Sequence, residues 1–165
     1  MSKFRMLTAV VMTMVLSSAM AAEGGFDNQK LYLGAGLSSN SLSGTDSSIG
    51  WQVLGGYEIA EVVKNIFVDA EVGYMDTGNM DVNCPIINCG STRARGLWAT
   101  GVGRVLASPQ VELLARFGYD FGDDDGFMGG IGAGYILNKQ TKLRVEFVER
   151  DHVDSVQFNV VFKLQ

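Results

Sequence analysis

Proline, cysteine and histidine are scarce in this chain, and each shortage excludes a class of protein. Its 165 residues include two prolines, two cysteines and one histidine. Two thiols without a nearby histidine make a poor zinc site, and no phosphate-binding loop or dinucleotide-binding fingerprint appears. Beyond the first residues, no run approaches the ~18 apolar residues of a membrane-spanning helix. We therefore expect no metal ion, no cofactor and no helical membrane span.

Positive charge is also in short supply, with 13 basic against 18 acidic residues. Proteins that bind nucleic acid present a basic surface to the phosphates, so this balance argues against a nucleic-acid partner. Glycine, by contrast, is abundant with 21 residues. Glycine within strands lets backbones approach closely and lets a sheet curve.

The first 21 residues are typical of an export signal. Lys3 and Arg5 form a basic start, residues 6–16 are apolar apart from two threonines, and small residues dominate 17–21. The apolar run is too short to cross ~30 Å of hydrocarbon as a helix. We predict a secretory signal peptide over 1–21, with cleavage after Ala22 as the alternative, and one domain over 22–165. That mature chain keeps 11 basic and 18 acidic residues, a formal charge of −7.

Long stretches of the mature chain alternate strictly between apolar and polar or small residues. Such a period of two is typical of strands, whose side chains point alternately to opposite faces. Runs of about 10 residues match the length that crosses a bilayer as a tilted strand. The pattern predicts eight strands at 30–38, 48–58, 65–75, 93–104, 110–121, 127–137, 142–150 and 156–164.

The segments between these strands alternate in length. We expect short turns at 59–64, 106–109 and 138–141, and mostly longer polar loops at 39–47, 76–92, 122–126 and 151–155. Short turns at one end and longer loops at the other are typical of outer-membrane barrels, with both termini in the periplasm. The sequence therefore predicts an all-β, eight-stranded antiparallel up-and-down transmembrane β-barrel. Aromatic residues near the strand ends suit interfacial girdles; the alternative for them is the core of a soluble sandwich.

Several short motifs follow one another in an order known from one family. They are Gly-Gly-Tyr at 55–57, Glu-Val-Gly-Tyr at 71–74, Ala-Arg-Phe-Gly-Tyr at 115–119, Gly-Gly-Ile-Gly-Ala-Gly-Tyr at 129–135 and Arg-Val-Glu-Phe at 144–147. With the closing segment 160–164, they resemble the transmembrane domain of OmpA-like outer-membrane proteins. In size the chain is similar to the free-standing barrels of the OmpX and Ail type. The resemblance implies a cell outer-membrane location in a Gram-negative bacterium.

The predicted alternation directs many charged residues to the barrel interior. They are Asp69, Glu71, Arg93, Arg95, Glu112, Arg116, Asp120, Arg144, Glu146 and Arg150. An eight-stranded barrel is only wide enough for its own side chains, so these charges must pair. In OmpA-like barrels an inward glutamate and arginine form a salt bridge that opens into a narrow channel. Glu71 and Arg144 match those positions. The resemblance also implies a further acidic and a further basic position, which are occupied here by Gly134 and by Ala99 or Gly101, so the set of gate residues is incomplete. The pair is therefore either structural or a gate.

Cys84 and Cys89 are separated by four residues in the longest expected loop. In an exported chain, an even pair at such close spacing is most simply a disulfide. We predict that the two cysteines are bonded to each other.

Two segments of the expected loops contain residues that could take part in catalysis or bind a cation. His152 is followed by Val153 and Asp154, so it lacks the His-x-Ser order of lipid A deacylases; we expect an exposed loop histidine and no catalytic residue. The run 123–125 is three aspartates, which we interpret as a solvated turn, with weak divalent bridging to lipopolysaccharide phosphates as the alternative.

We expect a non-catalytic role: the support of outer-membrane integrity, with surface loops available for contacts. Alternatives are an Ail-like adhesin acting through 39–47 and 76–92, a narrow gated porin, and a lipid A enzyme. We expect a monomer that contacts outer-membrane lipid and lipopolysaccharide and meets the barrel-assembly machinery during insertion. A surface ligand is not identifiable, because loops vary freely on a constant scaffold.

Overall fold

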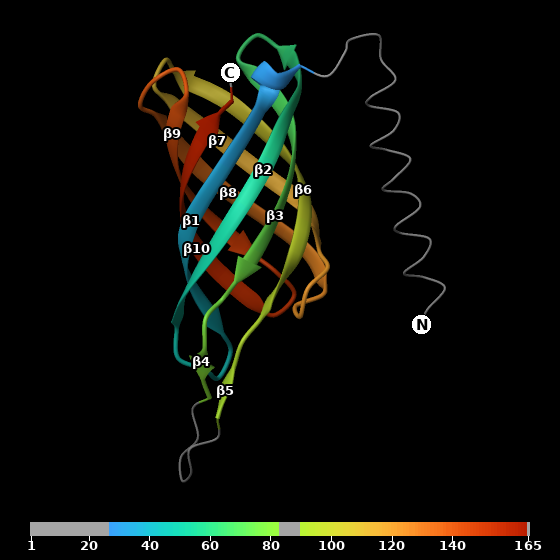
Figure 1. The fold of residues 1–165 in the computed structure, drawn as a ribbon, viewed down its shortest axis with the longest axis vertical. Helices are drawn as coiled ribbons and strands as arrows, with labels where there is room; N and C mark the ends of the chain where they lie inside the picture. Colours follow the sequence, from blue (N-terminus) through green and yellow to red (C-terminus); the bar gives the residue numbers. More distant parts are fainter. Residues whose placement is uncertain (1–26, 83–89, 165) are drawn as a thin grey trace, which may run out of the picture.

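Eight antiparallel strands close into a barrel in the computed structural model, which describes residues 27–82 and 90–164 (Figure 1). The barrel strands are β1 (Leu31–Leu42), β2 (Ser48–Val63), β3 (Ile66–Asp76), β6 (Arg95–Ser108), β7 (Val111–Asp120), β8 (Gly126–Ile136), β9 (Thr141–Glu149) and β10 (Val153–Lys163). Around the barrel they follow the order β1-β10-β9-β8-β7-β6-β3-β2. A short 3-10 helix, η1 (Asn28–Lys30), precedes β1. The predicted fold class is confirmed.

Connections at the two ends of the barrel differ in length, as expected. At one end, the turn end, β2 joins β3 through Lys64 and Asn65 alone, and the termini of the barrel lie at the same end (Figure 1). Asn65 adopts a φ of 69°, a left-handed conformation that asparagine tolerates better than most residues. The expected turn at 59–64 was too long, because β2 continues through two irregularities in its pairing with β3.

Connections at the opposite end, the loop end, are shorter than the sequence suggested in two places. β1 extends to Leu42, and β10 begins at Val153, so the last loop is only residues 150–152. Residues 77–82 and 90–94 extend from the barrel as the two arms of a tongue, which includes the two-residue strands β4 (Met80–Asp81) and β5 (Ser91–Thr92); these strands pair with each other. Thr45 of the first loop joins the tongue by an antiparallel bridge to Val82.

The base of the tongue is fixed to the barrel by Thr77. Its carbonyl oxygen accepts hydrogen bonds from the side chains of Asn40 (3.0 Å) and Ser48 (2.5 Å). Its backbone N–H donates to the carbonyl of Ala94, and its hydroxyl accepts from the Ala94 N–H at 2.9 Å. Both the predicted Cys84–Cys89 disulfide and the predicted signal peptide lie outside the described residues, so they stay predictions.

The outer wall of the barrel is apolar. Large side chains such as Leu37, Phe117 and Ile131 are more than 60% exposed, an arrangement that suits a surface covered by lipid. Aromatic residues gather toward the loop end, where Trp51 and Tyr74 lie 5.8 Å apart between ring centroids. Within the described residues, no helix has the length and apolar character needed to cross a membrane.

The inner wall of β8 is built largely from glycine, which makes room for large charged side chains. A Cβ atom on Gly132 would lie 2.6 Å from Cγ of Glu146, and one on Gly134 would lie 2.6 Å from Cγ of Glu112. Both distances are well inside van der Waals contact. The Gly-rich stretch of β8 therefore sets aside the volume that the interior side chains occupy.

Candidate functional site: the charged interior

Four charged side chains from three strands form a closed ring in the barrel interior; we call it the charge ring. Its members are Glu71 on β3, Arg116 on β7, and Arg144 and Glu146 on β9. Arg144 Nη1 lies 2.6 Å from Glu71 Oε1, and Arg116 Nη2 lies 2.9 Å from Glu71 Oε2. Glu146 completes the ring, 2.6 Å from Arg116 and 3.1 Å from Arg144. None of the four side chains is exposed.

The sequence-predicted pair Glu71 and Arg144 is thus brought together, but each has a second partner of opposite charge. Signs alternate around the ring, so two carboxylates and two guanidinium groups balance. Burying an unpaired ion costs several kcal/mol, and the alternation of charges offsets part of that cost. Asn159 extends the network, since its side-chain nitrogen donates to Glu146 Oε1 at 3.3 Å.

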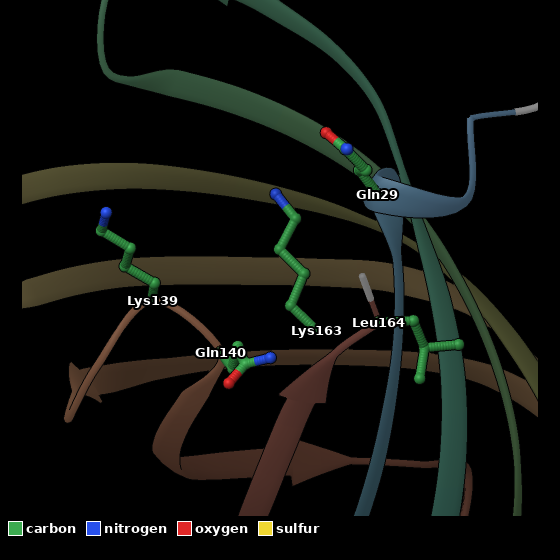
Figure 2. A pocket seen from close by; sticks show the side chains of 5 residues that line it. All are labelled: Gln29, Lys139, Gln140, Lys163 and Leu164. Atoms are coloured by element: carbon green, nitrogen blue, oxygen red, sulfur yellow. The ribbon is translucent and has the colours of Figure 1, made fainter.

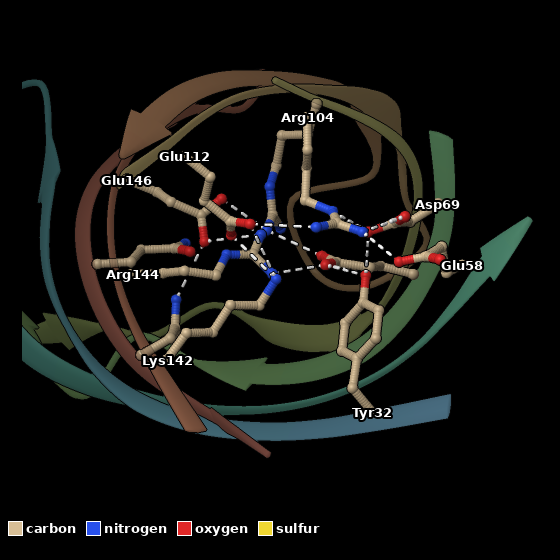
Figure 3. A network of polar contacts seen from close by, with 12 residues as sticks. Tyr32, Glu58, Asp69, Arg104, Glu112, Lys142, Arg144 and Glu146 are labelled. Carbon is tan, nitrogen blue, oxygen red and sulfur yellow. Dashed lines mark hydrogen bonds and ion pairs between the residues drawn. The ribbon is translucent and has the colours of Figure 1, made fainter. Parts of the chain in front are cut away.

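A second group of charges, the turn-end cluster, surrounds Arg104 (Figure 3). Arg104 binds Asp69 through two nitrogens at 2.5 and 2.9 Å, a bidentate geometry that only arginine offers. It also reaches Glu112 at 3.1 Å and Glu58 at 3.0 Å. Lys142 approaches Glu112 at 2.9 Å from β9, which is separated from β7 only by β8.

Tyr32 links the two groups. Its hydroxyl lies 2.7 Å from Glu71 Oε1 and 2.9 Å from Asp69 Oδ2. Figure 3 shows the ring of Tyr32 extending from β1 toward the carboxylate of Asp69. The charge ring and the turn-end cluster therefore form one continuous polar network across the barrel.

Toward the loop end the interior becomes apolar and then polar again. Met75, Trp98, Met128 and Val148 are at most 3% exposed, and Arg116 lies over the Trp98 ring at 5.1 Å. Beyond them, Arg150 donates to Asp120 at 3.1 Å and to Ser155 at 2.9 Å. Both charge and apolar packing close the interior.

Two of the predicted interior residues are not in the interior. Arg95 faces outward and is exposed, and Arg93 precedes β6, where its side chain is 45% exposed and pairs with Asp76 through two hydrogen bonds. The inward face of β6 carries Trp98, Thr100, Val102 and Arg104. The sequence predicted the opposite face to point inward. Residues 97–103 are apolar or small on both faces, so the alternation could not distinguish the inward from the outward face.

The remaining predicted interior residues are buried as expected. They are Asp69, Glu71, Glu112, Arg116, Asp120, Arg144, Glu146 and Arg150. Sequence reasoning missed Arg104 and Lys142, two further cations that pair with interior carboxylates near the turn end. Lys142 had a signal, because it shares the parity of Arg144 on the same strand.

The structure brings His152 and the aspartate run together at the loop end. His152 Nδ1 lies 3.0 Å from Asp124 and 3.3 Å from Asp151, and its side chain is 70% exposed. Ser155 lies apart from them, buried in the barrel, where it donates to Asn40. Asp124 is buried too, because it accepts the N–H groups of His152 and Val153, so it is not simply solvated. Within the described residues, no three His, Cys, Asp or Glu side chains gather as a metal site.

Comparison with known proteins decides the family. The sequence matches the outer membrane protein beta-barrel domain over residues 7–162. The chain belongs to this family. It is an outer-membrane β-barrel of a Gram-negative bacterium, which confirms the predicted location. A comparison with curated protein sequences finds no match.

Solved structures similar to this outer-membrane barrel are themselves membrane barrels. A de novo designed transmembrane β-barrel has 19% identity and a TM-score of 0.54, with 84% of this chain and 98% of the other covered. Neisserial surface protein A has 12% identity and a TM-score of 0.54, with coverages of 82% and 97%. Ail of Yersinia pestis, in a phospholipid nanodisc, has 10% identity and a TM-score of 0.53, with coverages of 80% and 97%. At these identities the likeness concerns the fold.

Proposed function

We propose that this protein is a sealed, non-catalytic outer-membrane barrel that supports the integrity of the membrane and presents its loops for contacts. The charge ring carries the proposal. Its four side chains meet across the barrel with none of them exposed, and apolar residues close the interior beside them. An interior filled in this way argues against a continuous water-filled path along the barrel axis.

A deletion strain tests the role in integrity. Loss of the protein should increase sensitivity to detergent and to large hydrophobic antibiotics that an intact outer membrane excludes. Complementation with the wild-type chain should restore resistance, and so should a chain with residues 43–47 replaced by a glycine-serine linker. Unchanged sensitivity in the deletion strain would remove the integrity role.

A narrow gated porin is the second candidate, and the double partnership of Glu71 favours it. Arg144 and Arg116 both bind this carboxylate, so Glu71 has a second partner when one arginine moves away. Single-channel recordings in planar bilayers separate the candidates: a sealed barrel gives no openings, whereas a gated porin opens and Arg144→Ala changes its open time.

An Ail-like adhesin would act through the tongue and the first loop, which are joined by the Thr45–Val82 bridge. Ail of Yersinia pestis has been solved with the heparin analogue sucrose octasulfate. Among the described residues, the loop end exposes aspartates at 46, 81, 123, 125 and 151, which outnumber the exposed Arg93 and Arg95. This acidic surface repels a polysulfate, so an adhesin role would need a different class of ligand. Whole-cell binding with and without residues 43–47 tests it.

A further inference from the structure

The turn end of the barrel opens into a funnel of two overlapping cavities. The outer cavity, of about 330 Å³, is lined by Gln29, Lys139, Gln140, Lys163 and Leu164 (Figure 2). The inner cavity, of about 160 Å³, shares Lys139, Gln140 and Lys163 with it and extends to Arg104 and Lys142, together with the carboxylates Glu58 and Glu112. The funnel therefore leads from the periplasmic side to the turn-end cluster.

Backbone hydrogen bonds hold the two segments that carry the outer lysines side by side. The N–H of Lys163 donates to the carbonyl of Gln140 at 2.7 Å. The side chain of Asn138 accepts the N–H groups of Gln140 and Thr141, each at 2.9 Å, and so fixes the turn that carries Lys139. Figure 2 shows the amino groups of Lys139 and Lys163 extending to the same side of the ribbon. The spacing of the two lysine backbones is preset.

Positive charge predominates in the outer cavity. Its wall has two ammonium groups and two amides but no acid. Lys139 makes no ion pair with any described residue, and Lys163 lies 4.0 Å from Glu58, which is 3.0 Å from Arg104. The deeper acids are already bound by Arg104 and Lys142. The funnel is thus an electropositive concavity in an otherwise acidic protein.

We propose that this funnel binds a phosphate group at the boundary between the inner leaflet of the outer membrane and the periplasm. Two ammonium groups and two amide donors match the several acceptor oxygens and the negative charge of a phosphate. Leu164 lines the cavity and is 39% exposed, and the neighbouring Phe162 is 51% exposed on the lipid-facing wall. The site therefore suits an anionic phospholipid headgroup, and a free phosphate offers the same chemistry. It lies at the end of the barrel opposite the loops, so it is independent of the proposed function.

Native mass spectrometry of the mature protein, refolded in detergent with phosphatidylglycerol, tests the proposal. The double variant Lys139→Gln/Lys163→Gln should bind about five-fold less lipid, as expected for the loss of two exposed charge interactions. Lys64→Gln is the matched control, because Lys64 is an exposed lysine in a turn at the same end that lines neither cavity. It should bind as the wild type does. Lys139→Gln alone, at an exposed turn residue, gives an intermediate loss.

A titration with inorganic phosphate, followed by the amide NMR signals of Gln140 and Leu164, separates the two sources of phosphate. Saturable shifts that vanish in the double variant support a free phosphate ligand. Lipid adducts without such shifts support a headgroup. Equal lipid binding by the wild type and the double variant, or an equal loss in Lys64→Gln, would overturn the proposal. Heat-modifiable gel mobility verifies that each variant is folded.

Discussion

Tyr32 is the residue on which the two charged groups of the interior depend. Its hydroxyl has one proton and lies within 2.9 Å of carboxylate oxygens from both Asp69 and Glu71. Because Tyr32 is only 4% exposed, bulk water does not readily replace its hydroxyl as a hydrogen-bond donor. Tyr32 therefore joins two carboxylates on one strand that would otherwise repel each other.

Replacement of Tyr32 by phenylalanine should lower the free energy of unfolding by about 1–3 kcal/mol, the cost of leaving buried acceptors without a donor. Urea unfolding in detergent micelles, followed by tryptophan fluorescence, measures it. Tyr135→Phe is a suitable control, because Tyr135 lies on the outer face of β8 and is 46% exposed. A Tyr32→Phe variant as stable as the wild type would show that the link has no structural role.

Glu71 and Arg144 should be energetically coupled. Arg144→Ala removes one of two arginines from Glu71 and one of two from Glu146. Breaking a buried pair costs about 3–5 kcal/mol, and the remaining Arg116 moves the expected loss to the lower end of that range. Adding Glu71→Gln should restore part of the stability. A double-mutant cycle measures the coupling; strictly additive losses would contradict it.

Charged residues show where the sequence was sufficient and where it was not. Most of the interior charges follow from alternation, because their strands place apolar residues on one face only. The strand from Arg95 failed this test, since small and apolar residues occupy both of its faces. Arg93 and Arg95 then led the prediction to the wrong inward face for β6. Both lie near the loop end, outside the interior charges.

At the scale of elements, β8 shows how one strand makes space for its neighbours. Gly132→Ala would place a methyl group 2.6 Å from Glu146 Cγ and 2.5 Å from the carbonyl oxygen of Val145. The backbone oxygen has no room to move, so we expect a loss of about 1–3 kcal/mol in unfolding free energy. Gly103→Ala on β6 is the control, since nothing lies within 4 Å of its added methyl group. Equal stabilities of the two variants would contradict the packing argument.

The predicted disulfide between Cys84 and Cys89 falls between the two described arms of the tongue in the sequence, and it is tested separately. Thiol labelling of the denatured, non-reduced protein should find no free thiol at Cys84 or Cys89, and labelling after reduction should find two. Closing so short a loop contributes at most about 2–3 kcal/mol by the chain-entropy estimate. Quantitative labelling before reduction would refute the bond.

Element boundaries were predicted well where side chains alternate and poorly where pairing alone defines the strand. β7 and β8 differ from expectation by one residue at each end. β4 and β5 had no signal, because two residues are too few for a pattern. The extension of β2 to Val63 was missed because its pairing with β3 shifts register twice, which interrupts the alternation.

At the scale of the whole molecule, charge is distributed unevenly along the barrel axis. Aspartates dominate the described loops at one end, while Lys139 and Lys163 line the cavity at the other. Between them lies an apolar outer wall around paired interior charges. The apolar wall holds the barrel across the membrane. Because the number of strands is even, the first and last strands begin and end on the lysine-bearing side.

This arrangement predicts a fixed orientation that intact cells can reveal. A peptide epitope inserted within residues 43–47 should bind antibody on unpermeabilised cells, because that loop lies at the loop end beside the tongue. The same epitope appended after Gln165 should bind antibody only after the outer membrane is permeabilised, because β10 ends beside η1 at the turn end (Figure 1). Mass spectrometry of both purified proteins should also show a chain that begins at Ala22. Surface staining of the C-terminal epitope on intact cells would reverse the orientation, and with it the placement of the lysine funnel in the periplasm.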